Sequence, residues 1–422
     1  MVGVLSGESA ACACNVHILP PALMAGPRYA VSATSRATLY LVGVMTDTSP
    51  ITKDAVYEAL SRVEDPEIGK PITQLNMVES VSIDGNDVAV GVYLTIAGCP
   101  MRDTIESNTR AVLEDLEGIG EVSVTLHTMS DEQRRELAQS LRGQQSGPAI
   151  PFADPNSRTR VFAVASGKGG VGKSSMTVNL ATSLAKQGLS VGIIDADIYG
   201  HSIPGLMGSA GQGPTVVDEM LMPPIAHGVR HISVGQFVEG NAPIVWRGPM
   251  LTRAIQQFLA DVYWGDLDVL FMDLPPGTGD VAITVAQLVP NAELLIVTTP
   301  QAAAAEVAER AGTISQQTDQ PIAGVIENMA GMVMPDGSTM HIFGEGGGEQ
   351  VAERLTALTD NEVPLLGSIP LDPKLREHGD TGTPVVLDEP DSPAAKAITE
   401  VANKLKIRRT SLARKSLNLG VK

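Results

Sequence analysis

Residues 167–174 read Gly167-Lys168-Gly169-Gly170-Val171-Gly172-Lys173-Ser174, and this stretch decides the fold of the chain. It fits the pattern G-x-x-x-x-G-K-[ST], whose backbone N–H groups surround a polyphosphate. An apolar run over residues 161–165 precedes it and predicts a buried strand, and a helix-forming run over residues 175–187 follows it. Strand, glycine loop and helix, in this order, are the context in which such a pattern forms a phosphate site.

The residue types of this stretch suit a bound polyphosphate. Glycines accept unusual backbone dihedral angles and add no bulk, so the loop wraps the phosphates closely. The helix that follows from Ser175 directs its positive end at the anion. We expect Lys173 to reach the β- and γ-phosphates and Ser174 to ligate Mg²⁺, with all residues from Gly167 to Ser175 in the binding loop. Lys168 is a surplus lysine, which is either a solvated surface residue or a second phosphate-binding cation.

The composition of the chain excludes several classes of fold and function. The chain has 422 residues and is 43% hydrophobic but 3% aromatic, which favours aliphatic, layered α/β packing over a β-sandwich. A formal net charge of −18 argues against nucleic-acid binding, because phosphate backbones would be repelled. Three cysteines do not make a disulfide scaffold, and they fit a reducing cytoplasmic location. No apolar run approaches the ~18 residues of a membrane span, so we expect no transmembrane segment.

The chain divides into five parts by composition and hydrophobic period. We interpret residues 1–46 as a disordered extension, with a targeting peptide or a start codon placed too early as alternatives. Residues 47–130 predict a small α+β domain with the order α-β-β-α-β, and residues 131–158 predict a linker. Residues 159–406 predict the nucleotide-binding domain. Residues 407–422 form a basic tail, which is either a solvated tail or a membrane-targeting segment.

Cys99 lies just ahead of a helix that we expect over about residues 101–116 of the small domain. Most lone cysteines are small buried hydrophobic residues. A position at the start of a helix, with Pro100 as the first helical residue, lowers the pKa of a thiol and favours a reactive or metal-binding thiolate. One thiolate does not hold a metal cluster alone, so a second chain or a partner would be needed.

Acidic residues follow two of the strands expected after residue 160. Strands and helices alternate there, which predicts a doubly wound, mainly parallel α/β sheet with helices on both faces. Ligands bind at the carboxyl ends of the strands in such sheets. We expect Asp273 and Asp195 to hold Mg²⁺ and Asp197 to orient the attacking water. Gly277 follows Asp273 and is placed to offer a backbone N–H to the γ-phosphate.

The glycine loop, with its surplus lysine, resembles the deviant Walker A motif of the MinD/ParA/nitrogenase-iron-protein class of P-loop ATPases. Four further stretches closely resemble the Mrp/ApbC family, namely residues 195–200 (Asp-Ala-Asp-Ile-Tyr-Gly), 246–250 (Trp-Arg-Gly-Pro-Met), 274–280 (Leu-Pro-Pro-Gly-Thr-Gly-Asp) and 342–348 (Ile-Phe-Gly-Glu-Gly-Gly-Gly). The small domain, with Leu-Thr-Ile-Ala-Gly-Cys-Pro at residues 94–100, resembles metal–sulfur cluster assembly factors. The resemblance covers about residues 50–405.

This resemblance implies an ATPase, with ATP and Mg²⁺ as cofactors, that carries or assembles iron–sulfur clusters for apoprotein clients. It implies a homodimer that sandwiches two nucleotides, in which Lys168 reaches the phosphates bound by the partner. It further implies catalytic roles for Lys168, Lys173, Asp197 and Asp273. Asn328 matches the asparagine that contacts adenine in this class.

The chain departs from the family pattern at the usual cluster site. The family carries a Cys-x-x-Cys pair shortly before the Phe-Gly-Glu-Gly segment, and two such pairs hold a bridging [4Fe–4S] cluster in the dimer. Residues 332–341 here read Met-Val-Met-Pro-Asp-Gly-Ser-Thr-Met-His, without a cysteine. Cluster ligation requires thiolates, so Cys99 is the remaining candidate ligand for an iron–sulfur cluster. A metal-free, nucleotide-switched adaptor or positioning ATPase is therefore the alternative function.

Overall fold

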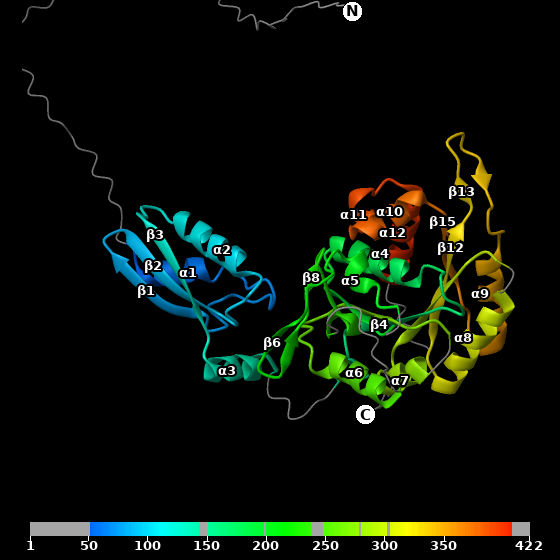
Figure 1. Ribbon diagram of the computed structural model, residues 1–422, viewed down its shortest axis with the longest axis horizontal. Helices are drawn as coiled ribbons and strands as arrows, with labels where there is room; N and C mark the ends of the chain where they lie inside the picture. Colours follow the sequence, from blue (N-terminus) through cyan, green and yellow to red (C-terminus); the bar gives the residue numbers. More distant parts are fainter. Residues whose placement is uncertain are drawn as a thin grey trace, which may run out of the picture. The chain divides into compact units, whose positions relative to one another are not determined.

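The computed structural model of the protein describes residues 51–142, 150–197, 200–237, 248–277, 280–301 and 304–406 (Figure 1). The extension expected at residues 1–46 and the basic tail expected at residues 407–422 lie outside the described residues, as does the middle of the expected linker. None of the helices in the described ranges is long and apolar enough to cross a membrane.

The small domain has the predicted order of elements, which are α1 (Lys53–Leu60), β1 (Val78–Asp84), β2 (Asp87–Leu94), α2 (Arg102–Glu114) and β3 (Val122–Thr128). Strands β1 and β2 form an antiparallel hairpin, and β3 lies parallel to β2 on its other side. Apolar side chains of both helices are buried together with those of the sheet in one core (Val56, Leu60, Ile105, Leu113, Val90). The helices therefore cover one face of a three-stranded sheet.

The segment predicted to be a linker begins with a helix, α3 (Asp131–Arg142). Its start is fixed by a reciprocal pair of hydrogen bonds at its N-terminus. Ser130 Oγ accepts from the backbone N–H of Gln133 at 3.2 Å, and Gln133 Oε1 accepts from the N–H of Ser130 at 2.9 Å. This is a capping box, a motif that marks a helix start even where the following residues are polar.

The larger domain is built on an eight-stranded sheet with the order β15-β12-β11-β4-β10-β5-β9-β8. All neighbouring pairs are parallel except β8–β9. The strands are β4 (Arg160–Ala165), β5 (Val191–Asp195), β8 (Ile225–Ala226), β9 (Val229–Ser233), β10 (Val269–Asp273), β11 (Glu293–Thr298), β12 (Ile322–Ala330) and β15 (Leu365–Pro370). The mainly parallel sheet that the sequence predicts is confirmed.

Helices cover both faces of this sheet, as predicted for a doubly wound fold. One core contains Val161 and Ala163 of β4, packed with the 3₁₀ helix η1 (Pro151–Ala153) and the helices α6 (Gly248–Ala260), α7 (Asp280–Leu288), α8 (Ala304–Thr318) and α9 (Gly347–Thr359). The other contains Phe162 and Val164, packed with α4 (Lys173–Lys186), α5 (Ile203–Leu206), α10 (Pro373–Thr381), α11 (Val385–Asp388) and α12 (Pro393–Lys406). Because alternate residues of a strand point to opposite faces, β4 is apolar on both sides.

Several short elements were not anticipated from the sequence. They are the hairpin of β6 (Thr215–Val217) and β7 (Met220–Met222), the 3₁₀ helix η2 (Val234–Phe237), and the hairpin of β13 (Met332–Val333) and β14 (Thr339–Met340). Strands of two or three residues are too short to show a hydrophobic period. The β13–β14 hairpin occupies the segment where the family's Cys-x-x-Cys pair was expected.

Candidate nucleotide-binding site

The site lies where strands β4, β10 and β5 end side by side. The parallel register places Asp273 beside Val164 on one flank and beside Asp195 on the other. The glycine loop follows β4, and α4 begins at Lys173 with Gly172 as its N-cap. Gly172 has a left-handed φ of +82°, which glycine adopts without the steric cost that a side chain brings. The topology thus brings the loop, the helix start and both carboxylates to one edge of the sheet.

Asp273 is the centre of the contacts at this edge. Its carboxylate is fully buried and accepts hydrogen bonds from Ser174 Oγ at 2.6 Å and from Thr177 Oγ1 at 2.8 Å. Lys173 Nζ lies 2.8 Å from Asp273 Oδ2. A serine hydroxyl next to an aspartate at a strand end is the pair that holds Mg²⁺ in P-loop enzymes. The predicted grouping of Lys173, Ser174 and Asp273 is therefore present in the structure.

The surroundings of Lys173 fit a phosphate group. The side chain is 6% exposed, and Nζ makes no hydrogen bond of good geometry although it forms the ion pair with Asp273. A buried ammonium carries three donors and is costly to leave unsatisfied. It stands at the first residue of α4, where the helix end also favours an anion. Lys173 thus offers unsatisfied donors beside the start of α4, where a phosphate group would satisfy them.

Asp195 and Asp197 follow β5 with different environments. Asp195 is almost wholly buried, and it accepts from Ser233 Oγ at 3.0 Å and from the N–H of Asp197 at 3.1 Å. Burial, together with the charge of Asp273, raises the pKa of Asp195 to about 8. Asp197 accepts from the N–H of Gly200 at 3.1 Å. A divalent cation beside Asp195 and Asp273 would stabilise both carboxylates in the ionised form.

Lys168 and Gly277 lie on the rim of the loop, and both make contacts within the protein. Lys168 Nζ contacts Gln301 Oε1, and the carbonyl of Lys168 accepts from Ser166 Oγ at 3.0 Å. The N–H of Gly277, which the sequence predicts to face the γ-phosphate, donates to the carbonyl of Ser166 at 2.9 Å. To donate to a phosphate, this N–H must first break its hydrogen bond to the carbonyl of Ser166.

Asn328 lies under the glycine loop near the end of β12. It is 3% exposed, its Nδ2 donates to the carbonyl of Val171 at 2.8 Å, and its Oδ1 is buried without a hydrogen-bond partner. A Cβ atom added to Gly172 would lie 2.3 Å from Asn328 Nδ2. In this structure Asn328 therefore supports the loop, and its contact with adenine stays a prediction.

The structure bears out the interpretation of Cys99 as a small buried residue and contradicts the alternative of a thiol with a lowered pKa. Helix α2 begins at Arg102 with Met101 as its N-cap, so Pro100 is not the first helical residue and the thiol lies outside the first turn. Cys99 is 7% exposed, and burial, followed by the charges of Glu67 and Asp65, raises its pKa to about 11. Within the described ranges, no group of three or more His, Cys, Asp or Glu side chains is arranged to hold a metal ion.

Sequence reasoning missed three residues that support the site. Thr177 stands one turn after Lys173 and binds Asp273, Ser233 at the end of β9 binds Asp195, and Gln301 contacts Lys168. Thr177 was detectable, because positions i and i+4 of a helix share a face. Ser233 was not, since it lies 38 residues from Asp195 and is brought there by the pairing of β5 with β9.

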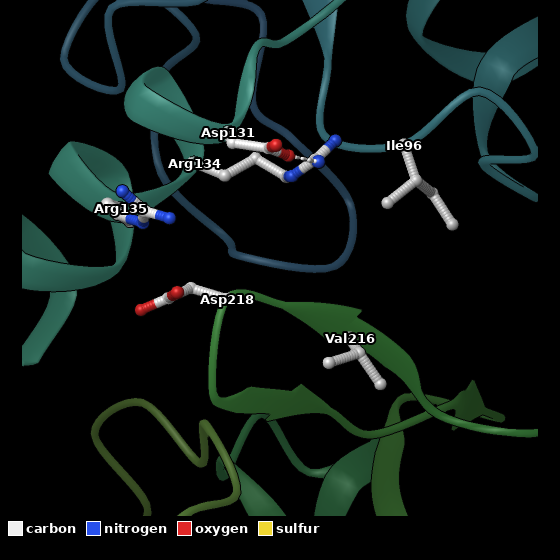
Figure 2. A pocket seen from close by; sticks show the side chains of 6 residues that line it. All are labelled: Ile96, Asp131, Arg134, Arg135, Val216 and Asp218. Atoms are coloured by element: carbon white, nitrogen blue, oxygen red, sulfur yellow. Dashed lines mark hydrogen bonds and ion pairs between the residues drawn. The ribbon is translucent and has the colours of Figure 1, made fainter.

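A separate pocket of about 360 Å³ contains none of these residues (Figure 2). Its lining comes from Ile96, from α3 and from the β6–β7 hairpin. Figure 2 shows the guanidinium of Arg134 turned toward the carboxylate of Asp131, with which it forms an ion pair. The charged side chains of the lining are two arginines and two aspartates, so the pocket has no net positive charge to attract a phosphate.

The fold and the site define a P-loop NTPase of the MinD/ParA type. Two family models match the chain: that of the NUBPL iron-transfer P-loop NTPases at residues 157–406, and that of the iron–sulfur cluster assembly proteins at residues 53–126. The chain belongs to the family of NUBPL iron-transfer P-loop NTPases, with an iron–sulfur cluster assembly domain in front.

Similar proteins share most of their length with this chain. It is 59% identical over 368 residues to an iron–sulfur cluster carrier protein of Mycobacterium leprae, covering 87% of this chain and 96% of that protein. It is 39% identical over 358 residues to an iron–sulfur cluster carrier protein of Bacillus subtilis, covering 84% and 97%. A solved nucleotide-binding protein in complex with ADP from Archaeoglobus fulgidus is 35% identical, covers 63% of this chain and 95% of its own, and has a TM-score of 0.49.

Proposed function

We propose that this chain is an Mg²⁺-dependent ATPase that carries iron–sulfur clusters and passes them to apoproteins in the cytoplasm, acting as a homodimer. The observation that carries the proposal is the grouping of Lys173, Ser174 and Asp273 in a chain whose two domains match iron-transfer and cluster-assembly families. The names of the relatives, which are cluster carrier proteins in M. leprae and B. subtilis, support the same cargo.

The loop from Gly167 to Ser175 binds the phosphates of ATP in this proposal. Lys173 moves from Asp273 to the β- and γ-phosphates, and the α4 N-terminus adds its backbone donors. Ser174 and Asp273 would hold Mg²⁺, with Asp195 at the same edge of the sheet. The ion would supply positive charge that neutralises the phosphates. Asn328 binds adenine.

Asp197, Lys168 and Gly277 complete the hydrolytic site. Asp197 orients the attacking water, because it lies two residues after Asp195, the residue of β5 that pairs with Asp273, and carries a carboxylate near that edge. Lys168 leaves Gln301 and reaches the phosphates of the second subunit, which stabilises charge in the transition state. Gly277 exchanges the carbonyl of Ser166 for the γ-phosphate, so that its loop responds to the presence of that phosphate.

Cys99 is the proposed cluster ligand in the part of the chain that the structure describes. A dimer supplies two such thiols, so client or small-molecule thiols complete the coordination of the cluster. The raised pKa of Cys99 means that the thiol holds its proton at neutral pH until iron displaces it. Cluster loading by this residue should therefore be faster at higher pH.

Anaerobic reconstitution with iron and sulfide tests the proposal. Wild-type protein should acquire the visible absorbance of a cluster, with iron and sulfide in matching amounts, and should activate an apo-dehydratase when mixed with it. Cys99→Ala should lose the cluster but keep ATP hydrolysis. The double variant Cys12→Ala, Cys14→Ala is the matched control and should keep both the cluster and ATP hydrolysis. A wild-type protein that binds no iron, or a Cys99→Ala variant that loads and delivers clusters normally, would overturn the assignment.

Two observations favour the second function, a metal-free nucleotide-switched adaptor. Residues 332–341 lack cysteine, and the thiol of Cys99 is buried with a raised pKa. If this function holds, the reconstituted protein carries no iron, while client capture in pull-down experiments differs between ATP and ADP. Equal capture with both nucleotides would exclude the adaptor.

A further inference from the structure

The β13–β14 hairpin places three methionines on one face. The strands are antiparallel, with Met332 directly opposite Met340 and Val333 opposite Thr339. Met334 follows two residues after Met332, and its N–H donates to the carbonyl of Ser338 at 2.8 Å, so the pairing continues past β13. Alternate residues of a strand share a face and opposite residues are neighbours. The side chains of Met332, Met334 and Met340 therefore gather on the same side of the hairpin.

The other face of the hairpin holds different chemistry. A Cβ atom added to Gly331 would lie 2.2 Å from Thr339 Cγ2 and 3.1 Å from His341 Cε1, so both side chains lie on the side opposite Met332. The His341 ring also lies 3.5 Å from Glu345. The methionine face thus presents thioethers without an imidazole among them.

These methionines do not serve as core residues. Met340 is 49% exposed and Met332 and Met334 are half-buried, and none of the three belongs to the apolar cores of the described residues. Met332 and Met334 instead line a hollow of about 500 Å³ together with residues of the β15 end and of the starts of α10 and α12. Met340 does not line the hollow, but it is exposed directly opposite Met332 on the hairpin, so the soft, polarisable thioethers of all three methionines are accessible to a ligand.

The hollow also carries an unbalanced negative charge. Its charged lining residues are Asp372, Lys374, Glu389 and Asp391. Lys374 pairs with Glu389 at 2.8 Å, and Asp391 pairs with Lys396 at 3.2 Å. Asp372 Oδ1 accepts from the N–H of Lys374, whereas Asp372 Oδ2 is buried without a hydrogen-bond partner. This carboxylate favours a cation in the hollow.

We propose that the hairpin binds one soft monovalent metal ion of the Cu(I) type through the thioethers of Met332, Met334 and Met340. Thioether ligands select Cu(I) over Mg²⁺, Zn²⁺ and other harder ions, and three of them suit its low coordination number. A thioether carries no proton, so binding at this site releases none and does not change between pH 6 and pH 8. This site is separate from the nucleotide site and from the iron–sulfur cargo proposed above.

Silver(I) is the redox-inert probe for the first experiment, which uses full-length protein labelled at the methionine ε-methyl groups. The background variant Cys12→Ser, Cys14→Ser, Cys99→Ala removes thiolates, which would bind the ion more tightly. We expect the methyl resonances of Met332, Met334 and Met340 to move together and to saturate at one Ag(I) per chain. Met250, which is equally exposed at 49% on α6, should not move. The proposal would be overturned if the hairpin resonances did not move. It would also be overturned if the resonance of Met250 moved as much as theirs without reaching saturation.

Anaerobic competition with a coloured Cu(I) chelator gives the second measurement. In the same Cys12→Ser, Cys14→Ser, Cys99→Ala background, one Cu(I) per chain should be retained, and each single Met→Leu substitution in the hairpin should weaken retention at least about tenfold, because one of three ligands is lost. Leucine keeps the volume and the apolar character of methionine, so the hairpin should stay folded, and Met250→Leu serves as the control. Unchanged retention in the hairpin variants would exclude the site, and the resonance experiment decides the question if any variant fails to fold.

Discussion

Gly172 carries two constraints that can be separated by substitution. Its φ of +82° disfavours any side chain, and a Cβ atom there would collide with Asn328 Nδ2 at 2.3 Å. We expect Gly172→Ala to abolish nucleotide binding, because the loop must shift away from Asn328 and from the start of α4. Fluorescent ATP-analogue titration measures this directly.

Gly188→Ala is the matched control for that substitution. Gly188 has a similar φ of +86° but nothing within 4 Å of an added Cβ atom. This variant should lose about 1–2 kcal/mol of stability from backbone strain and should bind nucleotide normally. Equal loss of binding in both variants would mean that a general loss of stability, and not the contact of the loop with Asn328, explains the effect.

His231 makes the stability of the nucleotide-binding domain depend on pH. Burial, and to a smaller extent the charge of His227, lowers its pKa from 6.5 to about 4, and Nε2 lies 2.7 Å from Ser209 Oγ. Between these two pKa values the unfolded chain binds the proton and the folded chain does not, so stability is lost as pH falls below about 6.5. Because of this residue, the free energy of unfolding should be about 2 kcal/mol lower at pH 5 than at pH 7.

Urea unfolding at pH 7 and pH 5 measures this effect. Tryptophan fluorescence reports the nucleotide-binding domain, because both tryptophans of the chain, Trp246 and Trp264, lie in it. The variant His231→Gln should show a smaller loss between the two pH values than the wild type. If the two proteins lose the same free energy of unfolding, His231 is not the cause.

At the scale of the element, α3 shows how two side chains set a helix boundary. Ser130→Ala should remove the capping hydrogen bond to Gln133 and destabilise the helix by about 1 kcal/mol. Amide hydrogen exchange over residues 131–142 should accelerate accordingly. Ser140→Ala, which removes a bond to the carbonyl of Leu137 within the same helix, should have a smaller effect. Equal acceleration in both variants would argue against the capping box.

Helices and strands long enough to show a hydrophobic pattern were predictable from the sequence. Short elements and elements made of polar residues were not. Strand β4, the glycine loop and α4 follow from an apolar run, two glycines and a lysine, and the rule for parallel sheets then places Asp195 and Asp273 together. The helix α3 was missed because its residues are polar, although its capping box was readable.

Properties that depend on burial in the folded protein could not be predicted from the sequence. The position of Cys99 before α2 predicts a lowered pKa, whereas the folded domain excludes water from the thiol and raises its pKa. The contact of Ser233 with Asp195 likewise depends on strand order, since β9 pairs with β5 after a long intervening segment. Local pattern thus predicts which groups reach an edge of the sheet, and packing decides their protonation.

In this structure Lys168 contacts Gln301 of its own chain. At the scale of the whole molecule, the proposed role of Lys168 at the partner's phosphates leads to a prediction about assembly. If Lys168 acts on the partner's nucleotide, the ATPase rate per chain must rise with protein concentration as dimers form. Lys168→Ala should lower the rate roughly 100-fold, because a cation supplied by a second subunit stabilises transition-state charge. Lys70→Ala, on the exposed surface of the small domain, is the control and should change nothing.

Light scattering separates assembly from chemistry in the same set of proteins. Asp197→Asn should bind Mg²⁺–ATP without hydrolysing it and should therefore accumulate as a dimer with ATP and as a monomer with ADP. Adding Lys168→Ala to this variant should weaken the dimer, since a contact between subunits is removed. A wild-type rate per chain that does not depend on concentration, together with full activity of Lys168→Ala, would show that each subunit hydrolyses ATP alone.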